Sequence, residues 1–146
     1  MAKPLASRWS RNLAIIVGIM LPTTLLLYRF IAPVAAGWAL TDSYDHTSAE
    51  VARAYAVRVL PLLAFYSAAA FACTRLIDSN RKGYWSCPII FAAVLFALLF
   101  QSTGLSGRVP FRQEIELQLP IVVPLVGAAI GCGAAWLLTS RRHEAI

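Results

Sequence analysis

Four long apolar segments, separated by short stretches that carry nearly all of the charge, constrain this chain more than any other feature. They cover residues 13–33, 54–73, 84–105 and 119–139. Each has close to the roughly 20 residues that an α-helix needs to cross a ~30 Å hydrocarbon layer, and none shows the polar stripe of a water-facing helix. The sequence therefore predicts an all-α membrane protein in which four transmembrane helices form a compact bundle with short loops.

The composition agrees with this class, because 59% of the residues are hydrophobic and only 14% are charged. Soluble globular domains have about half apolar and about a quarter charged residues. Outside the four spans, the two tails and three loops are each shorter than the ~40 residues below which independent folding usually needs staples. We therefore expect residues 1–146 to form one domain, the membrane bundle, with the lipid bilayer as its first partner.

The charges are distributed unevenly between the two predicted ends of the bundle. One end carries five basic and five acidic residues, whereas the other carries an excess of basic residues. The members of this second group are Lys3, Arg8, Arg11, Arg75, Arg81, Lys82, Arg141 and Arg142, with Asp78 and Glu144. The positive-inside rule then predicts that both termini are cytoplasmic, and we expect a bacterial inner (plasma) membrane. The basic residues form no stripe with interleaved aromatics, so no nucleic-acid partner is expected.

The first apolar segment also has some features of a secretory signal peptide. Basic residues precede it, and small residues follow it at Val34, Ala35 and Ala36. Its apolar run is longer than the usual 7 to 15 residues of a signal peptide's apolar region. We expect it to be retained as a span, although cleavage would leave three.

Small residues recur at four-residue spacing in two of the predicted spans. The fourth span has Gly127, Gly131 and Ala135, and the second has Ala64 and Ala68. Small side chains let membrane helices approach closely, which favours association where lipid is as apolar as leucine. We expect the second and fourth spans to pack tightly. The spacing leaves open whether Gly127 and Gly131 serve contacts within one chain or between chains.

Two arginines, Arg29 and Arg58, lie several residues inside predicted apolar segments, towards the less basic end. An arginine there costs from about 1 to a few kcal/mol unless it snorkels to the interface or finds a partner. Three interpretations stay open: interface anchoring, ion pairs with Asp42, Glu114 or Glu116, and a binding site for an anion or a protein partner.

The two loops at this end have different patterns. In the first, Thr47 and Glu50 have capping-box spacing, which predicts that a helix begins near Ser48. Asp42 and Asp45 precede this cap in a spacing that matches no familiar metal site, so we interpret them as loop residues and candidate partner contacts. In the second loop, residues 114–119 alternate between polar and apolar, which predicts a strand or an extended linker.

No enzymatic signature is present, and the two histidines fall on opposite sides of the predicted membrane. The spacing of Cys73, Cys87 and Cys132 matches no zinc or redox pattern, so they are interpreted as small packing residues. We expect no catalytic residue, no cofactor and no metal. The favoured hypothesis is a non-enzymatic protein that binds another membrane component, either as an accessory subunit or as an immunity or defence factor. The alternative is a small transporter or channel that acts as an oligomer.

Overall fold

The computed structural model describes residues 5–31, 48–77, 82–102 and 113–144, and these ranges are almost entirely helical. The elements in chain order are α1 (Leu5–Leu26), the π-helix η1 (Leu27–Ile31), α3 (Ser48–Leu76), the 3₁₀-helix η2 (Lys82–Trp85), α4 (Ser86–Ser102) and α5 (Gln113–Glu144).

Four helical segments are long and apolar enough to cross a membrane, which confirms the predicted number of spans. They are Arg8–Ile31, Val59–Leu76, Gly83–Phe100 and Ile121–Thr139. Predicted residues 32–33 and 103–105 lie outside the described ranges.

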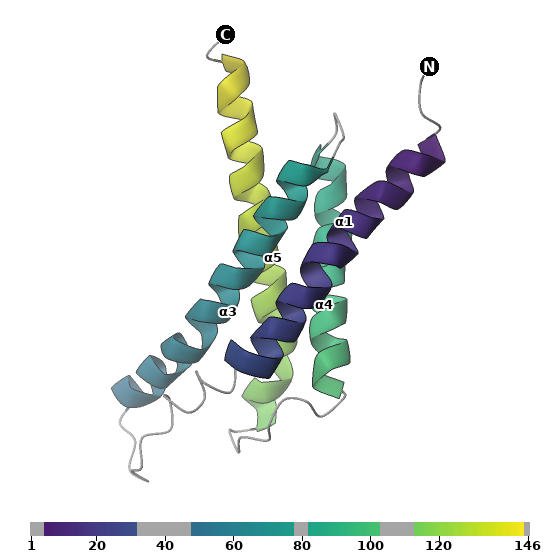
Figure 1. Ribbon diagram of the computed structural model, residues 1–146. Helices are drawn as coiled ribbons and strands as arrows, with labels where there is room; N and C mark the ends of the chain where they lie inside the picture. Colours follow the sequence, from purple (N-terminus) through teal and green to yellow (C-terminus); the bar gives the residue numbers. More distant parts are fainter. Residues whose placement is uncertain (1–4, 32–47, 78–81, 103–112, 145–146) are drawn as a thin grey trace.

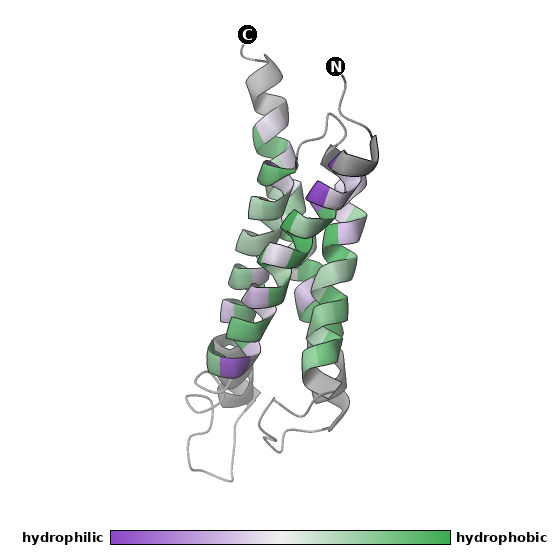
Figure 2. Ribbon diagram, turned by 45° about the vertical axis from the view of Figure 1, so that its right-hand side comes forward, coloured by the Kyte–Doolittle hydropathy of each residue, from purple (hydrophilic) through white to green (hydrophobic). Residues whose placement is uncertain are grey.

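The four long helices form an elongated bundle (Figure 1). The start of α1 and the end of α5 lie at one end of this bundle, as expected for an even number of spans. The end of the first helix and the starts of α3 and α5 lie at the other end. Most residues along the helices are hydrophobic, and strongly hydrophilic ones occur mainly towards the two ends (Figure 2).

The start of α3 matches its prediction, whereas the start of α5 does not. The helix α3 begins at Ser48, and Thr47 of the predicted cap lies outside the described residues. Residues 114–119, predicted to be a strand or an extended linker, belong to α5, and Pro120 therefore lies inside this helix. Glu, Gln and Leu are good helix formers, and acidic residues are favourable in a first helical turn. These preferences outweigh a six-residue alternation.

The core lies where α3 packs against α5, with α4 beside α5 and α1 across α3 and α4. Met20, Tyr66, Ile89 and Ala128 are among its buried members. Large apolar side chains elsewhere are exposed, including Leu60 at 61% and Phe91 at 68%. Exposed apolar side chains of this kind are typical of helices that contact lipid, and they suggest a membrane-embedded bundle.

In α1, Pro22 is followed by two threonines that bond back to the preceding turn. The hydroxyl of Thr23 donates to the carbonyl of Ile19 at 2.7 Å, and that of Thr24 donates to the carbonyl of Met20 at 2.8 Å. These bonds satisfy both hydroxyls inside an apolar segment, so neither threonine leaves a polar group unpaired in the bundle.

Candidate functional site

The predicted contact between the second and fourth spans is present, and glycines on α5 make it possible. A Cβ added to Gly127 would lie 2.8 Å from the Cβ of Tyr66, and one added to Gly131 would lie 2.9 Å from the Cβ of Ala70. The hydroxyl of Ser67 also donates to the carbonyl of Gly127 at 2.9 Å. Gly127 and Gly131 therefore face α3 of the same chain.

The face of α3 that meets α5 is not the predicted one. Ala64 and Ala68, which we expected to pack against the fourth span, are exposed, while Ser67 and Ala70 lie beside Gly131. Small residues occur on more than one face of α3, and their spacing alone does not identify the face that meets α5. Ala135 of α5 is only 1% exposed and extends the packed face as expected.

Ala64 and Ala68 belong to an exposed row along the whole of α3, which we call the outer α3 stripe. Its members recur at spacings of three, four and seven residues, which places them on one helix face. They are Arg53, Ala56, Leu60, Ala64, Ala68 and Arg75, all exposed. In the middle of the stripe, Ala64 and Ala68 each present only a methyl group.

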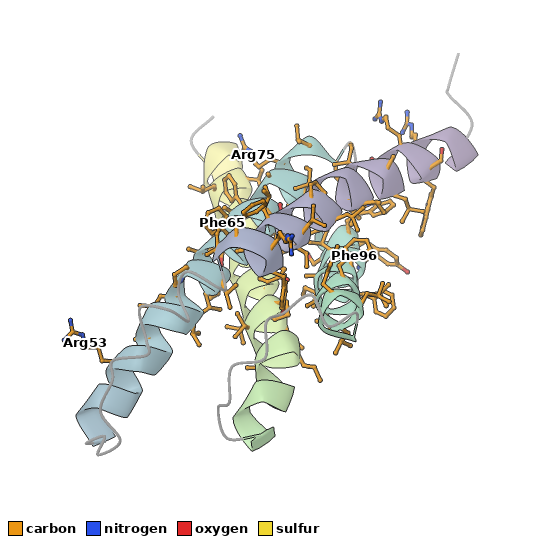
Figure 3. The ribbon with its side chains drawn as sticks, turned by 60° about the horizontal axis from the view of Figure 1, so that its bottom comes forward. Arg53, Phe65, Arg75 and Phe96 are labelled. Carbon is orange, nitrogen blue, oxygen red and sulfur yellow. The ribbon has the colours of Figure 1, made fainter. Side chains whose placement is uncertain are left out.

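Arginines mark both ends of the outer α3 stripe. The side chains of Arg53 and Arg75 project away from the bundle (Figure 3). Their 22-residue separation corresponds to about 33 Å of α-helix, close to the ~30 Å thickness of a hydrocarbon layer. In a bilayer, both guanidinium groups can reach an interface while the alanines between them face the hydrocarbon.

Arg29 lies in η1, near the end of the first span, and its side chain is exposed. The neighbouring turn is held to the bundle by the buried side chain of Leu27. Short π-helical segments inside helices occur often at functional sites, and a cation is favourable at a helix C-terminus. Arg29 is thus presented outward from a helix end that is packed against α3.

The remaining sequence-predicted contacts are only partly described. Arg58 lies in α3, and its side chain is outside the described part of the chain, so its position relative to the span stays a prediction. Glu114 and Glu116 occupy the first turn of α5. Asp42 and Asp45 lie outside the described residues. The ends of the helices that carry Arg29, Arg58 and the two glutamates share one end of the bundle (Figure 1).

Several polar side chains that the sequence analysis did not single out are buried inside the bundle. The hydroxyl of buried Tyr66 donates to Thr24 at 3.5 Å, which links α3 to α1, and Thr74 contacts the sulfur of Cys132 at the same distance. Asn12 of α1 is 2% exposed, and its Oδ1 has no hydrogen-bond partner among the described residues. Asn12 was not singled out from the sequence, because no local pattern around it indicates burial.

The cysteines divide into two environments. Cys73 and Cys132 are buried and consistent with packing roles, whereas Cys87 is exposed, which is contrary to its interpretation as a packing residue. Across the described ranges, no three His, Cys, Asp or Glu side chains lie close enough together to hold a metal ion.

No protein-family model, curated protein or solved structure matches this chain.

Proposed function

We propose that this chain is a non-enzymatic membrane protein that binds another membrane component along the outer α3 stripe. The observation that carries the proposal is that Ala64 and Ala68 are exposed. Their four-residue spacing is the same as that of Gly127 and Gly131, which bring α5 against α3 within this chain. A second transmembrane helix with small residues has the same opportunity for close packing on the stripe.

Lipid and a partner helix compete for the exposed face around Ala64 and Ala68. A flat row of methyl groups allows two helix backbones to approach, and the gain comes from van der Waals contact, since hydrophobic transfer contributes little between helices in lipid. Large exposed side chains on other helices, such as Phe91 of α4 and Ile130 of α5, hold a neighbouring helix further away. The centre of the stripe is therefore the favoured place for a partner helix.

Charged residues provide the second part of the proposed contact, at the end of the bundle where η1 ends and α3 and α5 begin. Arg29 is exposed there, and Arg58, Glu114 and Glu116 belong to helix ends on the same side of the bundle. Under the proposed topology, with both termini cytoplasmic in a plasma (bacterial inner) membrane, these charges face the outer compartment. The support for that topology is the excess of basic residues at the end shared by the tails. A partner reached from this side suits an accessory subunit or an immunity or defence factor.

Site-specific photocrosslinking in cells tests the proposal. A photoreactive amino acid at position 64 or 68 should form an adduct of one defined mass with a membrane protein, or with a second copy of this chain. The same amino acid at Ala14, an exposed alanine on α1, is the matched control and should give lipid adducts only. Lipid adducts alone at all three positions would refute docking on the stripe.

A bulky substitution then tests whether the stripe contributes to binding. Ala68→Leu should weaken recovery of the crosslinked partner about tenfold, because the added side chain keeps the partner's backbone away. Ala14→Leu adds the same atoms to an exposed site on another helix and should leave recovery unchanged. Equal losses in both variants would show that added bulk, and not this face, is responsible.

A further inference from the structure

We infer that a groove between α4 and α5 binds one acyl chain of an anionic phospholipid, with the headgroup at the basic end of the bundle. The groove has a volume of about 330 Å³. This lies at the lower end of the ~300–1,000 Å³ range of small-molecule sites and suits part of one chain. The inference concerns a face different from the outer α3 stripe and is independent of the proposed partner.

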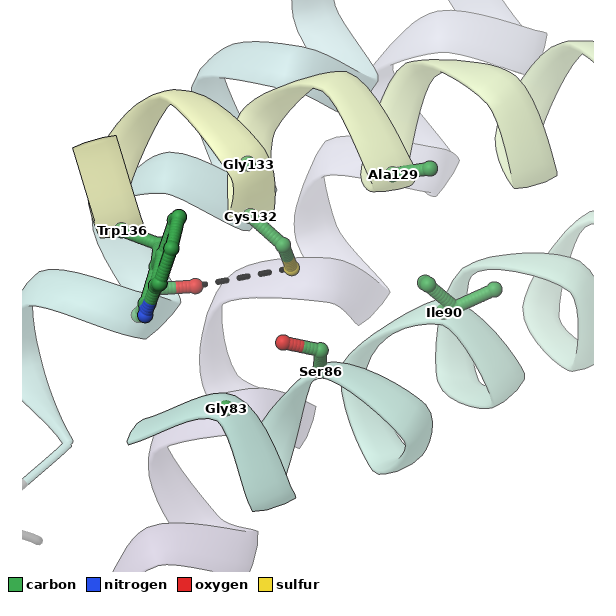
Figure 4. A pocket seen from close by; sticks show the side chains of 8 residues that line it. Gly83, Ser86, Ile90, Ala129, Cys132, Gly133 and Trp136 are labelled. Atoms are coloured by element: carbon green, nitrogen blue, oxygen red, sulfur yellow. Dashed lines mark hydrogen bonds between the residues drawn. The ribbon is translucent and has the colours of Figure 1, made fainter. Parts of the chain in front are cut away.

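Two glycines widen the groove because they have no side chains. Gly83 of η2 and Gly133 of α5 both line it, and a Cβ added to either would meet nothing within 4 Å. Neither glycine is needed for helix packing within the described residues, in contrast to Gly131 on the adjoining face of α5. Their absent side chains instead leave space beside the ring of Trp136 (Figure 4).

Polarity changes along the groove in the direction that an amphiphile requires. Ile90 and Ala129 line its deeper part, while Ser86, Gly83 and Trp136 lie towards the end of the bundle (Figure 4). On α4, Ile90 lies about one turn further from that end than Ser86. On α5, Ala129 lies about two turns further from it than Trp136. A phospholipid aligned with the bilayer has the same order, with its chain inward and its polar part at the interface.

The mouth of the groove is at the end of the bundle with the most basic residues. Lys82 directly precedes Gly83, a lining residue of the groove, in η2. Arg141 and Arg142 lie in α5 about 8–9 Å along the helix axis beyond Trp136. Three basic residues thus lie in helical segments at this end of the groove, and basic pockets between transmembrane helices bind acidic headgroups. This charge selects an anionic lipid over a zwitterionic one.

Native mass spectrometry of the intact protein in mild detergent tests the inference, with phosphatidylglycerol and phosphatidylcholine as probes. The wild-type protein should retain one phosphatidylglycerol about tenfold more strongly than phosphatidylcholine. Gly133→Leu should reduce this retention about tenfold, because its side chain occupies the groove. Gly18→Leu is the matched control, since Gly18 is also helical with open space around it, and it should retain the lipid as the wild type does.

A measurement on the wild-type chain avoids dependence on the folding of a variant. A phosphatidylglycerol with a photoreactive group in its chain should label the peptides that contain Ile90 and Ala129 more than those of α1. Replacing both Arg141 and Arg142 with Gln should abolish the preference for phosphatidylglycerol while labelling by the chain persists. Uniform labelling of all four helices, equal retention of the two lipids, or unchanged retention in Gly133→Leu would each overturn the assignment.

Discussion

Gly131 of α5 lies directly against the backbone carbonyl of Ser67 in α3, so closely that a methyl group on Gly131 would overlap the carbonyl oxygen. Since the obstructing atoms are backbone, no change of side-chain rotamer relieves the overlap. The two helices must move apart before any larger residue fits. This contact fixes the distance between α3 and α5, the pair that forms the largest helix interface of the bundle.

Gly131→Ala should therefore destabilise the fold by about 1–3 kcal/mol, as overpacking does in tight cores. Gly131→Leu should prevent assembly. Gly133→Ala is the matched control two residues away, where a Cβ meets nothing within 4 Å. It should be neutral or stabilise the helix by up to ~1 kcal/mol. Unfolding in detergent, followed by circular dichroism, measures both, and equal stability of the two variants would contradict the packing argument.

Asn12→Leu should leave stability unchanged or raise it by about 1–3 kcal/mol. The substitution removes a buried oxygen that has no partner among the described residues, while a side chain of similar size keeps the site filled. Asn12→Ala should instead destabilise the protein, because it leaves a cavity. A loss of stability in Asn12→Leu, measured by the same unfolding experiment, would mean that the amide oxygen has a stabilising contact.

Arg58→Leu should preserve or improve membrane insertion, because an arginine in an apolar segment opposes insertion and leucine does not. If Arg58 contacts the partner, binding should be lost in this variant at matched membrane levels. Arg58→Lys is the control for simple anchoring, since a lysine stem also reaches the interface. Full partner recovery with Arg58→Leu in a pull-down would remove Arg58 from the contact.

Both termini should be cytoplasmic. Fusion of a reporter active only in the cytoplasm to the end of α5 should give full signal, while insertion between Asp42 and Glu50 should give none. Absence of signal from the C-terminal fusion would contradict this topology. Arg53 would then lie at the cytoplasmic interface and Arg75 at the outer one.

The four spans were predictable because apolar length is a one-dimensional signal and lipid imposes it on every helix. It is harder to predict which face of each helix packs against its neighbour. On α3, small residues occur both at Ala64 and Ala68 and at Ser67 and Ala70, and every face is apolar enough for lipid. Which row meets α5 depends on the shape of both helices together. The sequence of a single helix does not contain that information.

The start of α5 and the burial of Asn12 show two other limits of local sequence patterns. Residues 114–119 alternate like a strand, yet their helix-forming side chains continue a helix that lipid stabilises further along. Asn12 follows Arg11 in the sequence, and no prediction singled it out. Its burial results from packing of α1 across the other helices, which no local pattern reports.

The glycine contact between α3 and α5 also determines the order in which the bundle can be completed. These two helices are the second and fourth spans, and α4 lies between them in the chain. During synthesis, α3 must wait in the bilayer until the last helix has been inserted before its principal neighbour exists. A ribosome that stops before α5 therefore leaves three inserted helices without their main interface.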